Sequence, residues 1–328
     1  MDEFGLIAAL ARRLPKPGAD VLLGIGDDAA VVRTGGAPFV VTTDTMVEGV
    51  HFLATTLTDY NLGYKSLAVS VSDIAAMGGQ PKYAVVSIAI PSGWAPERLE
   101  RVYDGFREVT ERFGCHVIGG DVVSTSGPLV VTTTVIGEAA NPIPRSGARP
   151  GDILFVTGRL GGSSAGLQVM QEATPVSAIS KACLIERHQR PEPRVAIGSL
   201  CATAGVHALN DVSDGLASEL NEIATASGVR CVIDADKLPV LPEVVELARA
   251  VERDPLSYAL YGGEDYELVG AAPNRAFAAL LAGASALNVP VTRIGRVDEG
   301  DGVVMRRSDG QMEVLDSKGY NHFKRDDA

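Results

Sequence analysis

The sequence contains few cysteines and few aromatic residues. Its 328 residues include only four cysteines, and aromatic residues make up 5% of the chain. The cysteines are widely spaced and form no CxxC pair or Cys/His cluster, so a zinc site is not expected. Buried free thiols are the simpler interpretation, and they favour a reducing compartment.

The chain also lacks a surplus of basic residues and any long apolar run. With 29 lysines and arginines against 41 aspartates and glutamates, its net charge is −12. A nucleic-acid partner is not expected, because phosphate backbones are bound by stripes of lysine and arginine. No apolar run approaches the roughly 20 residues of a membrane span, and the acidic start is unlike a signal peptide. These features predict a cytoplasmic protein without membrane contact.

Hydrophobic residues and glycine are abundant, and they alternate in strand and helix patterns. Hydrophobic residues make up 46% of the chain, and its length allows two domains. We place the boundary in the proline-, glycine- and arginine-rich stretch NPIPRSGARPGD, which gives domains 1–147 and 148–328. Both halves predict an α/β (α+β) fold. The main expected helices are 4–14, 59–79, 95–114 and 214–228, and the main expected strands are 38–45, 82–91, 116–121, 129–138 and 229–234.

Two adjacent aspartates, Asp27 and Asp28, follow a flexible turn in GIGDDAAVV. Two like charges side by side repel each other by roughly 1–3 kcal/mol at an effective dielectric constant of about 20. An exposed turn would tolerate the pair, because water solvates both charges. A bound cation would explain the pair equally well, and further carboxylates in similar settings would favour it.

Five further aspartates interrupt apolar segments or follow them: Asp44, Asp73, Asp121, Asp211 and Asp214. All but Asp73 are expected at the carboxyl ends of strands, where α/β folds bind ligands. No lysine or arginine falls within 34–64 or 115–144, so no basic residue nearby in the sequence neutralises these acids. Each aspartate alone could be a turn or cap residue, but their recurrence favours a site for a divalent cation such as Mg²⁺, assembled from distant segments.

A glycine-rich stretch, GRLGGSSAGL (158–167), follows an expected strand and opens an expected helix. Such a loop could bind an anion through backbone N–H groups, but tight helix–strand packing is the favoured interpretation. It lacks the Lys-Ser/Thr ending of a Walker A motif and the GxGxxG of a dinucleotide site. No GxSxG elbow occurs either. The sequence therefore does not favour a P-loop kinase, a Rossmann dehydrogenase or a serine hydrolase.

Eight motifs occur in order along nearly the whole chain: GIGDDAAVV, TTDTMVEGVHF, YKSLAVSVSDIAAMGG, IGGD, RSGARPGD, NDVSDGL, YGGEDYEL and KGYNHF. Together they resemble the thiamine-monophosphate kinase family, of the ATP-binding superfamily typified by aminoimidazole ribonucleotide synthetase. The resemblance implies a two-domain fold, with an N-terminal α/β domain that forms the sheet of a homodimer and a C-terminal α/β domain. It also implies that ATP, as co-substrate, phosphorylates thiamine monophosphate to thiamine diphosphate with several Mg²⁺ ions.

The same resemblance implies roles for individual residues. The implied Mg²⁺ ligands are Asp27, Thr42, Thr43, Asp44, Asp73, Asp121, Asp211 and Asp214, with hydroxyl or backbone oxygens serving for the threonines. Asp28 would bind metal through water or orient its loop. The implied ATP contacts are Tyr103, Gly120, Asp121, Arg145 and Ser213. The implied substrate contacts are His51, Glu264 and Tyr320, since a carboxylate and an aromatic ring suit a cationic thiazolium and its pyrimidine.

Simpler roles are also open for several of these residues. Ser213 stands where it would cap a helix, Tyr103 has the spacing of a packing residue, and Arg145 could be a solvated loop residue. Gly120 would let the backbone approach ATP closely. No catalytic base is expected, because the attacking phosphate oxygen of the substrate is already ionised near neutral pH. Direct in-line transfer without a phosphoenzyme is therefore expected.

Two other functions remain open from the sequence. Another ATP-dependent enzyme of the superfamily would share the fold and the acids but act on a different acceptor. A non-catalytic Mg²⁺–nucleotide-binding protein would need the acids without also needing Arg145, His51 and Glu264. Formation of thiamine diphosphate from thiamine monophosphate, ATP and Mg²⁺ would distinguish the three.

Overall fold

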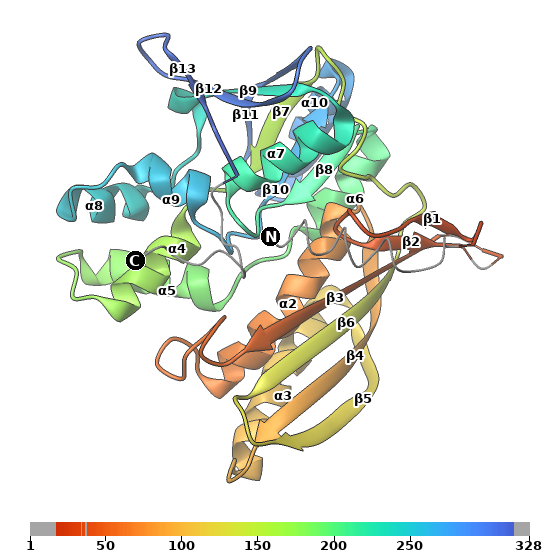
Figure 1. Cartoon of the computed structure of the whole chain (residues 1–328), viewed down its shortest axis with the longest axis vertical. Coiled ribbons are helices and arrows are strands. Elements are labelled where there is room, and N and C mark those ends of the chain that lie inside the picture. The colour runs from red at the N-terminus through yellow and green to blue at the C-terminus, as the bar shows by residue number, and fades with distance from the viewer. Residues whose placement is uncertain (1–17, 34, 37, 318–328) are drawn as a thin grey trace.

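The computed structural model describes residues 18–33, 35–36 and 38–317. The expected helix 4–14 and the motif KGYNHF, which contains Tyr320, lie outside the described residues. Figure 1 shows two β-sheets, one from each half of the chain, with helices packed against both. The expected two-domain α/β architecture is confirmed.

The N-terminal half forms a six-stranded sheet. Its neighbouring strands are antiparallel except for the last pair, which is parallel. In spatial order the strands are β1 (Val21–Leu23), β2 (Ala30–Val32), β3 (Phe39–Val47), β6 (Val130–Glu138), β4 (Gln80–Pro91) and β5 (His116–Thr125). Helix α2 (Asp59–Ala76) connects β3 to β4 and helix α3 (Pro96–Phe113) connects β4 to β5, whereas a short loop leads from β5 to β6, which inserts between β3 and β4.

Helices α2 and α3 pack on one face of this sheet (Figure 1). The side chain of Thr58 caps α2 by accepting a hydrogen bond from the Asn61 N–H at 3.1 Å. The two helices approach closely through glycine, because a Cβ on Gly63 would lie 1.8 Å from the Val102 carbonyl oxygen. Among residues 18–33, 35–36 and 38–147, no helix covers the other face of the sheet.

The C-terminal half forms a seven-stranded sheet covered on both faces. Helix α7 (Leu216–Ser227) shares a core with Leu154 and Val156 of β7, whereas α6 (Val195–Ala204) and α10 (Asn274–Ala286) pack with Phe155 on the opposite face. In spatial order the strands are β13 (Met312–Val314), β12 (Gly302–Arg306), β9 (Arg230–Asp234), β11 (Val291–Asp298), β7 (Ile153–Thr157), β10 (Leu268–Ala272) and β8 (Ala208–Asp211).

Four further helices form a smaller cluster beside the C-terminal sheet. They enclose an apolar core of their own around Leu184, Leu247 and Tyr258. Among the described residues, no helix combines the length and the hydropathy that crossing a membrane requires. The four helices are α4 (Gly162–Gln171), α5 (Ala178–Gln189), α8 (Pro242–Ala250) and α9 (Pro255–Tyr261).

Helix α2 joins the two halves. It is buried along most of its length, and its end packs against α6, where a Cβ on Gly198 would lie 2.1 Å from the Ala75 carbonyl oxygen. Ala76 belongs to a core cluster that otherwise comes mainly from the C-terminal half. A helix enclosed on all sides is expected to carry mainly small and apolar residues, so the charged side chains Lys65 and Asp73 within α2 call for a specific explanation.

Candidate functional site

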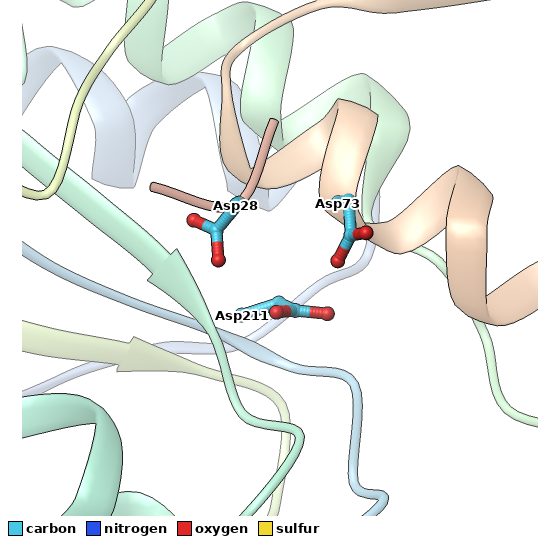
Figure 2. A group of neighbouring side chains, drawn as sticks. All are labelled: Asp28, Asp73 and Asp211. Atoms are coloured by element: carbon cyan, nitrogen blue, oxygen red, sulfur yellow. The ribbon is translucent and has the colours of Figure 1, made fainter. Parts of the chain in front are cut away.

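Three aspartates from distant segments meet beside the C-terminal half of α2. Asp28 comes from the loop between β1 and β2, Asp73 from α2, and Asp211 from the end of β8. One carboxylate oxygen of each lies within 4.8 Å of the others, and Figure 2 shows the three side chains pointing toward a common centre. We call this group the acid trio.

Burial makes the ionised form of the trio costly. It raises the pKa of Asp211 to about 6 and holds the pKa values of Asp28 and Asp73 well above their usual range. Repulsion adds to burial, because Asp73 lies close to the charges of Asp44, Asp211 and Asp28. A divalent cation would offset both effects.

Hydroxyl groups fix the orientation of the acids around this centre. Thr42 Oγ1 donates to Asp73 Oδ2 at 2.5 Å, and Ser72 Oγ donates to Asp211 Oδ2 at 2.5 Å. Asp28 Oδ2 is buried and makes no hydrogen bond to any residue that the structure describes. An all-oxygen set with one unsatisfied buried oxygen fits a hard cation such as Mg²⁺.

Asp44 stands beside the trio, but not at a strand end. Strand β3 continues to Val47, so Asp44 lies within the strand, where Ser70 Oγ of α2 donates to its Oδ2 at 2.7 Å. Thr43 alternates to the other face of the sheet, where its hydroxyl lies 2.9 Å from Thr134 Oγ1. The expected strand-end position of Asp44 is therefore wrong, because β3 is longer than its apolar part.

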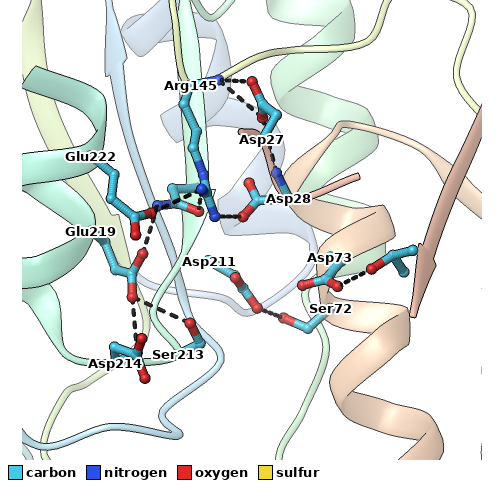
Figure 3. Close-up of polar contacts among 12 residues, drawn as sticks. Asp27, Asp28, Ser72, Asp73, Arg145, Asp211, Ser213, Asp214, Glu219 and Glu222 are labelled. Atoms are coloured by element: carbon cyan, nitrogen blue, oxygen red, sulfur yellow. Dashed lines mark hydrogen bonds and ion pairs between the residues drawn. The ribbon is translucent and has the colours of Figure 1, made fainter. Parts of the chain in front are cut away.

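Arg145 is the basic residue that the sequence pattern did not connect to these acids (Figure 3). It forms an ion pair with Asp28, and its Nη1 lies 3.1 Å from Glu222 Oε2. Its backbone N–H donates to Asp27 Oδ2 at 3.1 Å, which places Asp27 beside the trio and not within it. The counter-charge that appeared to be missing near Asp28 thus comes from 117 residues away.

The segment after Asp211 is held by a buried glutamate on α7. Glu219 Oε1 accepts from the Asp214 N–H at 2.8 Å and from Ser213 Oγ at 3.3 Å (Figure 3). Burial, together with repulsion from Glu222, raises the pKa of Glu219 well above its usual range. The helix-cap interpretation of Ser213 is wrong, because Gly215 is the N-cap residue of α7.

A cleft of about 890 Å³ opens next to the trio. It brings His51 and Glu264, the expected substrate contacts, together with Asp44 and Thr43 of β3 and with Ser213 and Asp214 of the C-terminal half. The remaining lining residues are Thr45, Met46, Val50, Val69, Ser164, Leu167, Gly263 and Tyr266. Residues expected to bind metal, ATP and substrate thus line one cleft between the two halves.

Two residues that the sequence analysis missed contact Glu264. Lys65 of α2 is fully buried, and its Nζ lies 3.0 Å from Glu264 Oε1, while His188 Nδ1 lies 3.4 Å from Glu264 Oε2. Burial alone would raise the pKa of Glu264, but the nearby charge of Lys65 outweighs that effect and holds the pKa below its usual value. The available signal for Lys65 was that it is the one basic residue in the mostly apolar run 62–77, whereas nothing local marked His188.

The glycine-rich stretch 158–167 serves packing, as the sequence predicted. Asp265 accepts hydrogen bonds from the N–H groups of Gly161 at 2.6 Å and Ser163 at 3.2 Å, so a carboxylate of the chain itself occupies the start of α4. A Cβ on Gly166 would lie 2.1 Å from the Leu184 carbonyl oxygen. These contacts account for the glycines without an external anion.

Tyr103, Gly120 and Asp121 are not part of the acid trio or the cleft lining: Gly120 and Asp121 lie in the edge strand β5, and Tyr103 lies on α3. Asp121 is exposed within β5, so its expected place at a strand end is wrong. Strands β6 and β4 separate β5 from β3, which puts Asp121 about 14 Å from Asp44 at the usual strand spacing. A Cβ on Gly120 would lie 1.8 Å from the Val86 carbonyl oxygen, so strand packing already requires this glycine. Tyr103 is exposed on α3, with its ring 5.3 Å from that of Phe106.

Comparison with known proteins identifies both halves of the chain. Residues 26–139 match the family described as "AIR synthase related protein, N-terminal domain", and residues 149–307 match the corresponding C-terminal domain family. The chain is 45% identical over 331 residues to thiamine-monophosphate kinase of Bacillus subtilis, which covers 99% of this chain and 100% of that protein. It is 35% identical to the enzyme of the same name from Aquifex aeolicus, over 98% of each chain.

Solved structures give the same result. The chain superposes on a structure of AaThiL complexed with AMPPCP and TMP with a TM-score of 0.87 and 34% identity, covering 98% of this chain and 97% of that one. The similarity therefore extends over both domains and the cleft between them.

Proposed function

The chain belongs to the thiamine-monophosphate kinase family, and we propose that its kinase activity, the ATP-dependent phosphorylation of thiamine monophosphate to thiamine diphosphate, proceeds by direct in-line transfer assisted by Mg²⁺. The observation that carries the proposal is the acid trio beside the cleft that contains His51 and Glu264, where Asp44 lines the cleft and lies close to Asp73 of the trio. Both reacting groups are phosphate anions, so their mutual repulsion is the main obstacle. Acids that bind cations beside the cleft address that obstacle.

Asp28, Asp73 and Asp211 would hold Mg²⁺, with Asp44 beside them. When bound, Mg²⁺ supplies neutralisation of phosphate charge and polarisation of the reacting oxygens. The hydroxyls of Thr42, Ser70 and Ser72 keep the acids in place as their charge is compensated. Asp27, Thr42, Thr43, Asp121 and Asp214 remain proposed ligands, with Thr43 acting through its backbone oxygen because its hydroxyl faces the other side of the sheet.

The phosphates and the thiamine moiety would occupy opposite ends of the cleft. Arg145 pairs with Asp28 of the trio and Ser213 stands two residues after Asp211, and a guanidinium and a hydroxyl suit the phosphates of ATP. His51 and Glu264 lie at the other end, where we place the thiamine moiety, with Tyr320 as a further proposed contact. No side chain needs to act as a base, because the attacking oxygen belongs to an ionised phosphate.

A homodimer is the second part of the proposal. Strand β5 is an edge strand exposed along nearly its whole length, and large apolar side chains are exposed on β5 and on the neighbouring β4: Ile118, Val122, Val123, Tyr83 and Val85. An exposed apolar edge of this kind favours pairing with a second chain. In such a dimer Tyr103, Gly120 and Asp121 would lie at the contact, where they could serve a site shared between two chains.

We also propose a cytoplasmic location and a domain division at residue 147. The cysteines support the first point, because all four are free and Cys115, Cys201 and Cys231 are buried. The segment between β6 and β7 supports the second, since it belongs to neither sheet and carries Arg145.

The decisive experiment is a product assay. The purified protein is incubated with ATP, Mg²⁺ and thiamine monophosphate, and thiamine diphosphate and ADP are separated by chromatography. Equal amounts of the two products, with no phosphorylated protein in rapid-quench samples, support direct transfer. ATP binding without product would instead support a nucleotide-binding protein, and turnover with only another acceptor would support a different enzyme of the superfamily.

A further inference from the structure

Lys65 has no part in the chemistry described so far, yet it is among the largest fully buried side chains of the protein. We propose that Lys65 is a positioning residue for the thiamine end of the substrate, because its ammonium group holds the Glu264 carboxylate in one orientation at the edge of the cleft. The inference rests on the proposed function, since it concerns how the same cleft recognises its acceptor.

The burial of Lys65 requires a charged partner. Its side chain is 0% exposed, and its Nζ lies 3.0 Å from Glu264 Oε1. An ammonium group without a partner in such a place would be strongly unfavourable, so the pair is coupled: each charge depends on the other. Glu264 differs from Lys65 in that its side chain is 29% exposed and lines the cleft. Lys65 therefore anchors the pair from the protein interior, and Glu264 presents its carboxylate to the substrate.

The second oxygen of Glu264 faces a neutral group. His188 Nδ1 lies 3.4 Å from Glu264 Oε2 and 3.0 Å from Ser163 Oγ. Burial and the nearby charge of Lys65 lower the pKa of His188 to about 4, so the ring is uncharged near neutral pH. Lys65 is therefore the cation that fixes the carboxylate, while His188 limits its rotation.

The backbone around Glu264 is also held in an unusual conformation. Glu264 and Tyr266 have positive φ angles of 67° and 50°, which residues other than glycine rarely adopt. The Glu264 N–H donates to the Ser213 carbonyl at 2.6 Å, and the Tyr266 N–H donates to the Val212 carbonyl at 2.9 Å. Strained backbone of this kind persists where its surroundings fix it, and it clusters at ligand sites.

These contacts fix the backbone of the loop independently of Lys65, so Lys65 orients only the side chain of Glu264. The main chain is tied to the segment after Asp211, and Asp265 is tied to the start of α4. Loss of the ammonium group would therefore release the carboxylate while the loop stays in place. Recognition of the thiamine moiety would weaken, and the trio that acts on the phosphates would keep its geometry.

The test is a double-mutant cycle of Lys65→Met and Glu264→Gln, assayed by steady-state kinetics. Each single variant should raise KM for thiamine monophosphate by about tenfold or more, as expected for loss of a hydrogen bond to a charged group. The kcat and the KM for ATP should change by less than about threefold, which marks lost binding and not lost catalysis. In the Glu264→Gln background, Lys65→Met should add no further increase in KM, because Lys65 acts through Glu264.

Lys181→Met, which removes an exposed lysine on α5, is the matched control and should leave all parameters unchanged. If Lys65→Met alone does not fold, the double variant, which removes both charges, is compared with Glu264→Gln. Equal KM values for thiamine monophosphate support the proposal. A higher KM in the double variant overturns it. An unchanged KM in a folded Lys65→Met protein, multiplied effects in the double variant, or equal losses in kcat and both KM values also overturn it. A wild-type protein without kinase activity would instead contradict the proposed function, and this inference with it.

Discussion

Acidic residues in two places beside the cleft have opposite electrostatic surroundings: those of the acid trio face other negative charges, and Glu264 faces a positive one. In the acid trio, Asp73 is surrounded by other carboxylates, and its pKa lies well above the usual range. At the other end, Glu264 is paired with a buried lysine, and its pKa lies below the usual range. The chain thus neutralises Glu264 with its own Lys65. The acid trio, by contrast, has three carboxylates and, among the residues that the structure describes, only one cationic partner, Arg145, which pairs with Asp28. The difference indicates where an external cation is needed.

One helix supplies both arrangements. Lys65 lies two turns before Ser72 and Asp73 on α2, so about 12 Å of helix separates the paired acid from the trio. Since α2 is buried between the two domains, both ends of the cleft are positioned by the same rigid element. This explains how substrate recognition and phosphate chemistry can be altered separately by mutations a few residues apart.

The largest effect should follow a change within the trio. We expect Asp73→Asn to lower kcat by about 10²–10³-fold, because it removes a negative ligand from the group that binds the cation. The metal-free protein should unfold at the same temperature or higher, since a buried repelling charge is lost. Steady-state kinetics and calorimetry measure the two effects, with exposed Asp301→Asn as the control. A drop in unfolding temperature together with unchanged kcat would show that the trio is structural.

A similar loss is expected for Asp121→Asn, but it should be recoverable. If Asp121 serves the site of a second chain, a mixture of Asp73→Asn and Asp121→Asn subunits contains dimers with one intact site. After dissociation and reassociation, such a mixture should regain roughly a quarter of wild-type activity, because half of its dimers are mixed and each has one of two sites restored. No recovery in a protein that sediments as a dimer would contradict the shared site.

Mg²⁺ should stabilise the protein in a pH-dependent way. Burial raises the pKa of Asp211 from 3.8 to about 6, so the metal-free protein loses stability as the pH rises through this window. A cation binds the ionised form, so the increase in unfolding temperature caused by Mg²⁺ should be larger at about pH 8 than at about pH 5.5. Calorimetry with and without millimolar Mg²⁺ provides the measurement. An equal increase in the Asp73→Asn variant would indicate that Mg²⁺ binds elsewhere.

The smallest effect concerns an acid that belongs to neither group. Asp265→Asn should lower the free energy of unfolding by about 1 kcal/mol, because it weakens the cap at the start of α4. KM for ATP should not change, since the residue lies away from the trio. Urea denaturation and steady-state kinetics test this expectation. A higher KM for ATP would contradict it, because it would show that Asp265 influences the acid trio.

The sequence predicted the parts of the fold that depend on local pattern. Strand β4 and helices α2 and α3 were expected nearly at their observed bounds, because continuous apolar runs and helical periodicity are local signals. The short strands β1 and β2 were not expected, since three-residue strands exist only through pairing with neighbours. Strand β5 was expected to end at Asp121 but continues to Thr125, because Gly-Gly-Asp resembles a strand end in the sequence whereas pairing with β4 carries the strand onward.

The site was predictable in its residue types more than in its pairings. Asp73 and Asp211 were identified because buried carboxylates are unusual in small, apolar segments. Arg145 was expected at phosphate but not as the partner of Asp28, since contacts across more than a hundred residues leave no trace in a single sequence. The sequence favoured Asp27 over Asp28 as a metal ligand, and this preference stays a prediction. Of the two residues, only Asp28 belongs to the acid trio.

The central claim is that the acid trio binds the metal that lets two phosphates meet. Crystals grown with a non-hydrolysable ATP analogue, thiamine monophosphate and Mn²⁺ in place of Mg²⁺ test it directly through anomalous scattering. The account predicts a peak in contact with carboxylate oxygens of Asp28, Asp73 and Asp211, bridging to nucleotide phosphate. Clear density for both ligands in the cleft, with no anomalous peak at these three residues, would contradict it.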